Sequence, residues 1–234
     1  IYYEGKHITQ NINKAIEYFT LSANQNHKDA QFFLGIIYYE GKHITQNINK
    51  AIEYFTISAN QNDKDAQFML GMIYYEGKHV IQNINKAIEY FTISVNQNHK
   101  DAQYYLGKIY YEGKYVTQNI NKAIKYFTLA ADQDIINAQY HLGVLYIDGK
   151  YITQNVNKAI EYFTLAANQN HKDAQFYLGI IYYEGKHVTQ NINKAIEYFT
   201  LSANQNHKEA QYQLGVIYYK GEHVTRNINK AIEY

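Results

Sequence analysis

The sequence contains no cysteine, no proline and no tryptophan in 234 residues. Without cysteine the chain cannot form disulfides, thiolate zinc sites, iron–sulfur clusters or a cysteine nucleophile. Without proline it contains no collagen-like or proline-rich linker segment, although about 5% proline is normal. We therefore expect a fold without covalent cross-links and no cofactor.

Net charge and long apolar runs are also scarce. The chain has 22 Lys and Arg against 21 Asp and Glu, a net charge of +1, which disfavours a nucleic-acid partner because phosphate binding depends on clustered positive charge. The longest apolar run, residues 32–39, is far shorter than the roughly 18 residues of a membrane span. We expect no direct membrane insertion and, with neither a signal peptide nor a glycosylation sequon in the sequence, a cytoplasmic location.

The sequence is dominated by an internal repeat. All 13 glycines fall into two series with a spacing of 36 residues. Strict self-similarity at such a period is typical of solenoid proteins. We therefore predict one continuous repeat domain over residues 1–234. Its units are 28–63, 64–99, 100–135, 136–171 and 172–207, with partial units 1–27 and 208–234.

Each unit carries the pattern of two helices. In residues 28–63, Ala30 and Leu34 share one face at helical spacing, and Gly41 is a suitable C-terminal cap. Asn47 is a suitable N-cap for the second helix.

Two further positions in the unit have a predicted backbone role. Asn62 follows the second helix, where a left-handed conformation is needed, and asparagine tolerates it. Gly35 lies inside the first helix, where we expect it to let the two helices approach closely.

The motif A-x-x-x-L-G-x-x-Y-x-x-G, followed by K-A-x-x-x-F/Y, resembles the Sel-one-like repeat, an α/α-solenoid family related to the tetratricopeptide repeat. In one unit the matching residues are Ala30, Leu34, Gly35, Tyr38, Gly41, Lys50, Ala51 and Phe55. The resemblance covers essentially the whole chain. It implies an all-α, right-handed α/α superhelical solenoid of 36-residue helix–turn–helix repeats.

By resemblance to tetratricopeptide solenoids, one face of each first helix is expected to line a concave groove. Its aromatic row comprises Phe32, Phe68, Tyr104, Tyr140 and Phe176, with Tyr212 in the last unit. Its central row comprises Ile36, Met72, Lys108, Val144 and Ile180. Its outer row comprises Tyr39, Tyr75, Tyr111 and Tyr183, with Ile147 in place of tyrosine. We use these three names below.

An aromatic groove is typical of a surface that binds an extended or helical peptide. Asp29, Glu40 and their equivalents edge the face with negative charge, which favours a basic partner. The alternative is that the tyrosines only fill gaps between repeats, with their hydroxyl groups in water.

The units differ most over residues 125–151. His141 has no counterpart in other units, and Ile147 and Asp148 replace tyrosine and glutamate. A specialised site is expected where near-identical copies differ, so we include His141 among the groove residues. Mutational drift in one unit explains the same observation.

The ten histidines suggest a metal site, but their spacing disfavours one. Most fall in two repeat positions, of which one is a loop (His7, His43, His79, His187, His223) and the other a helix junction (His27, His99, His171, His207). Equivalent positions lie about 10 Å apart in packed helices, whereas zinc needs donors at about 2.0–2.1 Å. We predict no metal site.

Motifs of the common hydrolases and nucleotide-binding proteins are absent from the sequence. We therefore predict no catalytic residues and a non-enzymatic scaffold or adaptor that binds a protein or peptide. The alternative is an architectural spacer, or a rod that self-associates end to end without a specific groove ligand.

Overall fold

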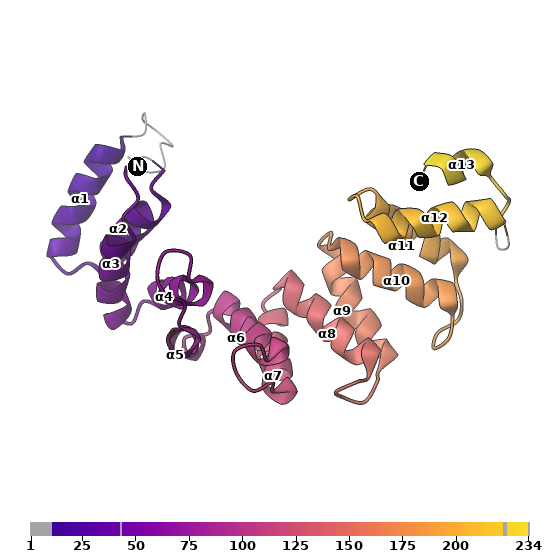
Figure 1. Cartoon of the computed structure of the whole chain (residues 1–234), viewed down its shortest axis with the longest axis horizontal. Helices are drawn as coiled ribbons and strands as arrows, with labels where there is room; N and C mark the ends of the chain where they lie inside the picture. The colour runs from indigo at the N-terminus through magenta and orange to yellow at the C-terminus, as the bar shows by residue number, and fades with distance from the viewer. Residues whose placement is uncertain (1–10, 43, 222–223, 234) are drawn as a thin grey trace. The chain divides into compact units, whose positions relative to one another are not determined.

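The computed structural model describes residues 11–42, 44–221 and 224–233. This part of the chain forms thirteen helices and no strand, which confirms the all-α prediction (Figure 1). The helices are α1 (Ile12–Asn24), α2 (Lys28–Glu40), α3 (Ile48–Asn60), α4 (Lys64–Glu76), α5 (Ile84–Asn96), α6 (Lys100–Glu112), α7 (Ile120–Ala131), α8 (Ile136–Asp148), α9 (Val156–Asn168), α10 (Lys172–Glu184), α11 (Ile192–Ala203), α12 (Lys208–Lys220) and α13 (Ile228–Glu233).

Even-numbered helices are the first helices of the units, and odd-numbered helices from α3 onward are the second helices. A first helix ends on a left-handed glycine, as Gly41 does with φ of 62°. The second helix then begins at an asparagine cap, where the Asn47 side chain accepts a hydrogen bond from the Lys50 amide at 3.0 Å. Both predicted helix boundaries are confirmed.

The turn between one unit and the next depends on a non-glycine residue in the left-handed region. Asn62 has φ of 64°, and its short polar side chain makes this conformation tolerable. The next first helix begins only two residues later, which brings the two helices into an antiparallel pair. The equivalent positive-φ residues are Asn26, Asn98, Asp134, Asn170 and Asn206.

A fully buried phenylalanine of the second helix is the centre of each complete unit. Phe91 has no exposed surface, and a Cβ added to Gly71 would lie only 2.5 Å from its ring. Because glycine has no Cβ, the backbone of α4 can pack directly against the Phe91 ring of α5, and the two helices approach closely, as the sequence predicts. Burial of one such ring contributes roughly 1.5–3 kcal/mol before conformational entropy is counted.

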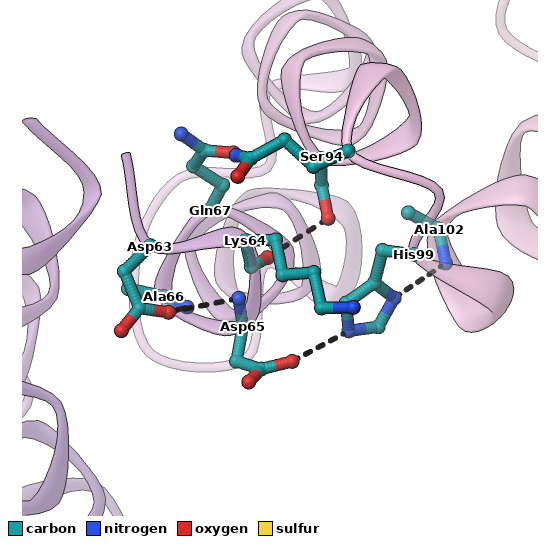
Figure 2. Close-up of polar contacts among 9 residues, drawn as sticks. Asp63, Lys64, Asp65, Ala66, Gln67, Ser94, His99 and Ala102 are labelled. Carbon is teal, nitrogen blue, oxygen red and sulfur yellow. Dashed lines mark hydrogen bonds and ion pairs between the residues drawn. The ribbon is translucent and has the colours of Figure 1, made fainter. Parts of the chain in front are cut away.

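A polar junction that the sequence did not predict joins the two helices of a unit and connects that unit to the preceding one. Ser94 donates to the Lys64 carbonyl at 2.8 Å (Figure 2), and Gln97 donates to the Gln67 side chain at 2.7 Å. Gln67 in turn donates to the Ala59 carbonyl at 3.2 Å. In the described residues no buried side-chain nitrogen or oxygen lacks a hydrogen-bond partner, so this junction carries no desolvation penalty from unpaired groups.

The chain divides into two compact units, one of residues 1–109 with 113–117, the other of residues 110–112 with 118–234. The first contains helices α1 to α5 and most of α6. The second contains the end of α6 and helices α7 to α13. Each is built from the same helix pairs. A single domain over residues 1–234 and the right-handed superhelix remain predictions.

Candidate functional site

The predicted groove residues from Phe32 to Tyr183 are half-buried, so each has one packed side and one exposed side, whereas Tyr212 at the end of the aromatic row is exposed. In the aromatic row, the ring centroid of Phe32 lies 5.8 Å from that of Phe55 in α3. Phe68 lies at the same distance from Phe91 in α5. These rings therefore extend the core of their own unit while part of their surface faces solvent.

The aromatic row also contacts the start of the following first helix. The ring of Phe68 stacks on the imidazole of His99, with centroids 4.6 Å apart. The same contact recurs at 4.5 Å and 4.7 Å between Tyr140 and His171 and between Phe176 and His207. Tyr212 of α12 has no following first helix in this sequence and is 69% exposed. Packing between units thus accounts for part of the aromatic repetition.

The outer row lies against the buried phenylalanines from a greater distance. Tyr111 is 6.1 Å from Phe127, and Tyr183 is 6.5 Å from Phe199. Burial raises the pKa of the Tyr39 and Tyr111 hydroxyl groups. In the central row, Ile36, Met72, Lys108, Val144 and Ile180 are also half-buried.

A further residue of several first helices packs on a buried phenylalanine. The sequence analysis identified only His141 from this set. Tyr105 stacks on Phe91 at 5.6 Å, and Tyr177 stacks on Phe163 at 5.0 Å. His141 occupies the same place on Phe127 at 5.0 Å, so it packs as an aromatic ring. The signal for this set was a repeat position that varies directly before an unchanging Leu-Gly pair, namely Phe33, Met69, Tyr105, His141 and Tyr177.

The acidic edge of the face is partly neutralised by neighbouring cations. Glu40 pairs with Lys42 at 3.3 Å, and Glu184 pairs with Lys186 at 3.0 Å. The Asp65 carboxylate accepts from Nε2 of His99 at 3.1 Å. The two lysine pairs weaken the negative field without removing it, because both lysines are largely in solvent.

The junction histidines are helix caps, a role that the sequence analysis did not foresee. Nδ1 of His99 accepts from the Ala102 amide at 3.2 Å while Nε2 faces Asp65 (Figure 2). Asp63 takes the same position one unit earlier and accepts from the Asp65 and Ala66 amides.

Both nitrogens of the His99 imidazole are therefore engaged, and neither is free for a metal. Burial lowers the pKa of His99, against the opposing charge of Asp65. No group of three His, Cys, Asp or Glu side chains that could hold a metal occurs in the described part of the chain. His7, His43 and His223 lie outside it.

A cavity of about 250 Å³ opens on the first-helix face between α8 and α10. Its apolar wall includes Ile147, Val156 and Ile180, and its rim includes Asp148 and Glu184.

A larger cavity of about 660 Å³ lies between α12 and the short α13, lined by Tyr212, Val216 and Ile232. It lies beside Gly215, the equivalent of Gly179, which faces the ring of Phe199 in the preceding unit. Among the described helices, none combines the length and apolar character needed to cross a bilayer.

Comparison with known families identifies the repeat. The Sel1 repeat model matches residues 1–27, 28–63, 64–99, 100–135, 136–171, 172–207 and 208–234. The matches cover the whole chain in consecutive segments and agree with the sequence resemblance. No curated protein matches closely enough to count as a relative.

Solved structures show the same fold. A protective antigen of uropathogenic Escherichia coli that displays an SLR fold has a TM-score of 0.94 and 27% identity, over 99% of this chain and 50% of its own. The chain therefore spans about half the length of that protein. A Sel1 repeat protein from Oxalobacter formigenes has a TM-score of 0.80 and 27% identity, over 100% of this chain and 97% of its own. The helix pairs thus form a helical solenoid.

Proposed function

The chain belongs to the Sel1 repeat family, whose members are generally protein–protein interaction scaffolds, and from this premise we propose that it is a non-enzymatic scaffold that binds a protein or peptide segment on its first-helix face. The observation that carries this proposal is the half-burial of the aromatic, central and outer rows. Packing on one side fixes these rings in place, and the other side remains available for contact. Rigid aromatic anchors of this kind are typical of protein interfaces because they bury a large area at low entropic cost.

Charge at the edge of the face favours a basic partner segment. Asp29, Asp65 and Asp173 lie at the starts of first helices, and Glu40, Glu76 and Glu184 lie near their ends. Lysines offset part of this charge, as described above, and electrostatics is expected to influence the association rate more than the affinity.

The proposal is tested by partner capture with two matched triple variants. One replaces the central-row residues Met72, Val144 and Ile180 by glutamate. The other replaces three residues of second helices by glutamate, namely Ile93, Leu165 and Leu201. Their side chains are 38%, 42% and 42% exposed. Proteins cross-linked to the wild-type chain are identified by mass spectrometry and then purified for direct binding. The account requires loss of binding in the first variant and retention in the second, with unchanged circular dichroism.

The second candidate function is a spacer or self-associating rod. The surface that such assembly would use is the apolar face at α12 and α13, where Tyr212 is 69% and Ile232 is 78% exposed. Sedimentation velocity over a hundredfold range of protein concentration separates the two candidates. Concentration-dependent assembly that Ile232→Glu abolishes, together with equal partner capture by both triple variants, supports the rod and contradicts the scaffold.

A further inference from the structure

The 250 Å³ cavity beside α8 occurs at the one outer-row position, Ile147, that is not tyrosine. An equivalent place exists three units earlier, where Tyr39, Ile73, Glu76, Lys78 and His79 surround a pocket of about 0 Å³. The corresponding residues at the cavity are Ile147, Ile181, Glu184, Lys186 and His187. These five positions carry the same residue types except that isoleucine replaces tyrosine. Elsewhere in the cavity wall, Val156, Tyr177 and Ile180 stand where the earlier place has Ile48, Met69 and Met72.

The backbone at the two places is held in the same way, so the added volume comes from differences in side chains, among them the isoleucine at position 147. Gln154 donates to the Ile147 carbonyl at 2.6 Å, and Gln46 donates to the Tyr39 carbonyl at 2.7 Å. Replacement of tyrosine by isoleucine removes a phenol ring from this fixed position. Tyr177 does not refill the space, because its ring stacks on Phe163 with centroids 5.0 Å apart.

The size and chemistry of the cavity select its occupant. A volume of about 250 Å³ is below the roughly 300–1,000 Å³ of pockets for drug-sized ligands, so it suits one side chain. The walls of Ile147, Val156, Ile180 and Ile181 are apolar, as an aromatic ring requires. At the rim, Asp148 and Glu184 provide two carboxylates against the single ammonium of Lys186.

We propose that this cavity binds one tyrosine or phenylalanine side chain of a partner segment, with a neighbouring lysine or arginine of that segment against Asp148. This inference rests on the proposed scaffold function and specifies its anchor site. The incoming ring takes the space that a tyrosine of the chain itself fills in other units. The divergence of residues 147 and 148 is thereby a functional feature rather than mutational drift.

The test uses the full chain and the tripeptide Ac-Lys-Tyr-Lys-NH2, with binding followed by NMR of isoleucine methyl groups. Saturable shifts are expected at the methyls of Ile147, Ile180 and Ile181. Ac-Lys-Ala-Lys-NH2 is expected to bind roughly tenfold or more weakly, because it lacks the buried ring. Asp148→Asn is expected to weaken the tyrosine peptide about two- to fivefold at low salt and less at high salt.

Two substitutions exchange the residues at positions 147 and 39, which distinguish the cavity from the equivalent place three units earlier. Ile147→Tyr restores the residue of the other units, so it is expected to keep the fold and to weaken the tyrosine peptide roughly tenfold or more. Tyr39→Ile is expected to create a second site, detected by shifts at the Ile73 methyls. Equal binding by wild type and Ile147→Tyr, equal binding of both peptides, or no binding of either overturns the proposal.

The partner captured by the wild-type chain then separates this inference from the proposed function. If the central-row variant loses the partner while Ile147→Tyr binds it with unchanged affinity, the scaffold function stands and the anchor site is wrong. If neither variant loses it, both are wrong. Loss in both variants, with the peptide results above, supports the anchor site.

Discussion

Gly71 and its equivalents show how little space separates the two helices of a unit. An added Cβ at Gly71 would lie 2.5 Å from the Phe91 ring, and one at Gly143 would lie 2.6 Å from Phe163. Both phenylalanines are fully buried, so their rings have nowhere to move. At Gly215, by contrast, the nearest atom is the Ala231 carbonyl oxygen at 3.5 Å.

This contrast gives a residue-scale prediction. Gly71→Ala is expected to lower the free energy of unfolding by about 1–3 kcal/mol, because overpacking exceeds the gain in helix propensity. Gly215→Ala meets no such obstacle and is expected to be neutral or to stabilise by up to about 1 kcal/mol. Urea unfolding measures both. A destabilisation of the same size at both sites would contradict the close-packing explanation.

At the scale of the helix, the caps differ in their response to pH. His99 caps α6 through an unprotonated Nδ1, whereas Asp63 caps α4 through a carboxylate. The imidazole is surrounded by Asp65 and Lys64 of α4, by Phe68, and by Asp101 of its own helix. Burial lowers its pKa despite the two carboxylates, and burial also lowers the pKa of His171.

The prediction follows from the sign of this shift. A lowered pKa means that the unfolded chain binds more protons, so stability is complete above the ordinary histidine value of about 6.5 and falls as pH decreases through the folded-state value. His99→Asn keeps a capping side chain and is expected to reduce the pH dependence of the unfolding free energy between about pH 7 and 5. A pH dependence identical to that of the wild type would refute the role of the histidine cap.

The parts of the fold that follow from local chemistry could be predicted from sequence. Gly41, Asn47 and Asn62 fix helix ends through their own backbone and side-chain preferences, whatever surrounds them. The histidine caps could not be predicted, because histidine is not a usual N-cap and acts here in contact with Phe68 of the preceding first helix. The cavity at Ile147 needed the position of Tyr177 in the next unit, which no single repeat contains.

At the scale of the whole molecule, most burial occurs between helices that are close in sequence. The buried core around Phe163 includes Ala166 of α9 and Leu178 of α10, and Tyr140 and Val144 of α8 pack against it. Each unit therefore depends on its neighbours, and stability is approximately a sum of unit and interface contributions.

The number of units should consequently determine thermal stability. Residues 28–99 contain two units and residues 28–207 contain five, with the same kinds of contact in each. The shorter chain is expected to have a clearly lower Tm in differential scanning calorimetry, because it has fewer interfaces between units. Equal Tm values would show that the units fold independently.

The central claim is that the first-helix face is the surface that binds a partner. Its most direct test is the Kd of the purified partner, measured by isothermal titration calorimetry for the wild type and the two triple glutamate variants. The account predicts at least about tenfold weaker binding when Met72, Val144 and Ile180 are replaced, as for residues at an interface core. It predicts binding within about twofold of wild type when Ile93, Leu165 and Leu201 are replaced. Equal Kd values for the two variants would contradict it.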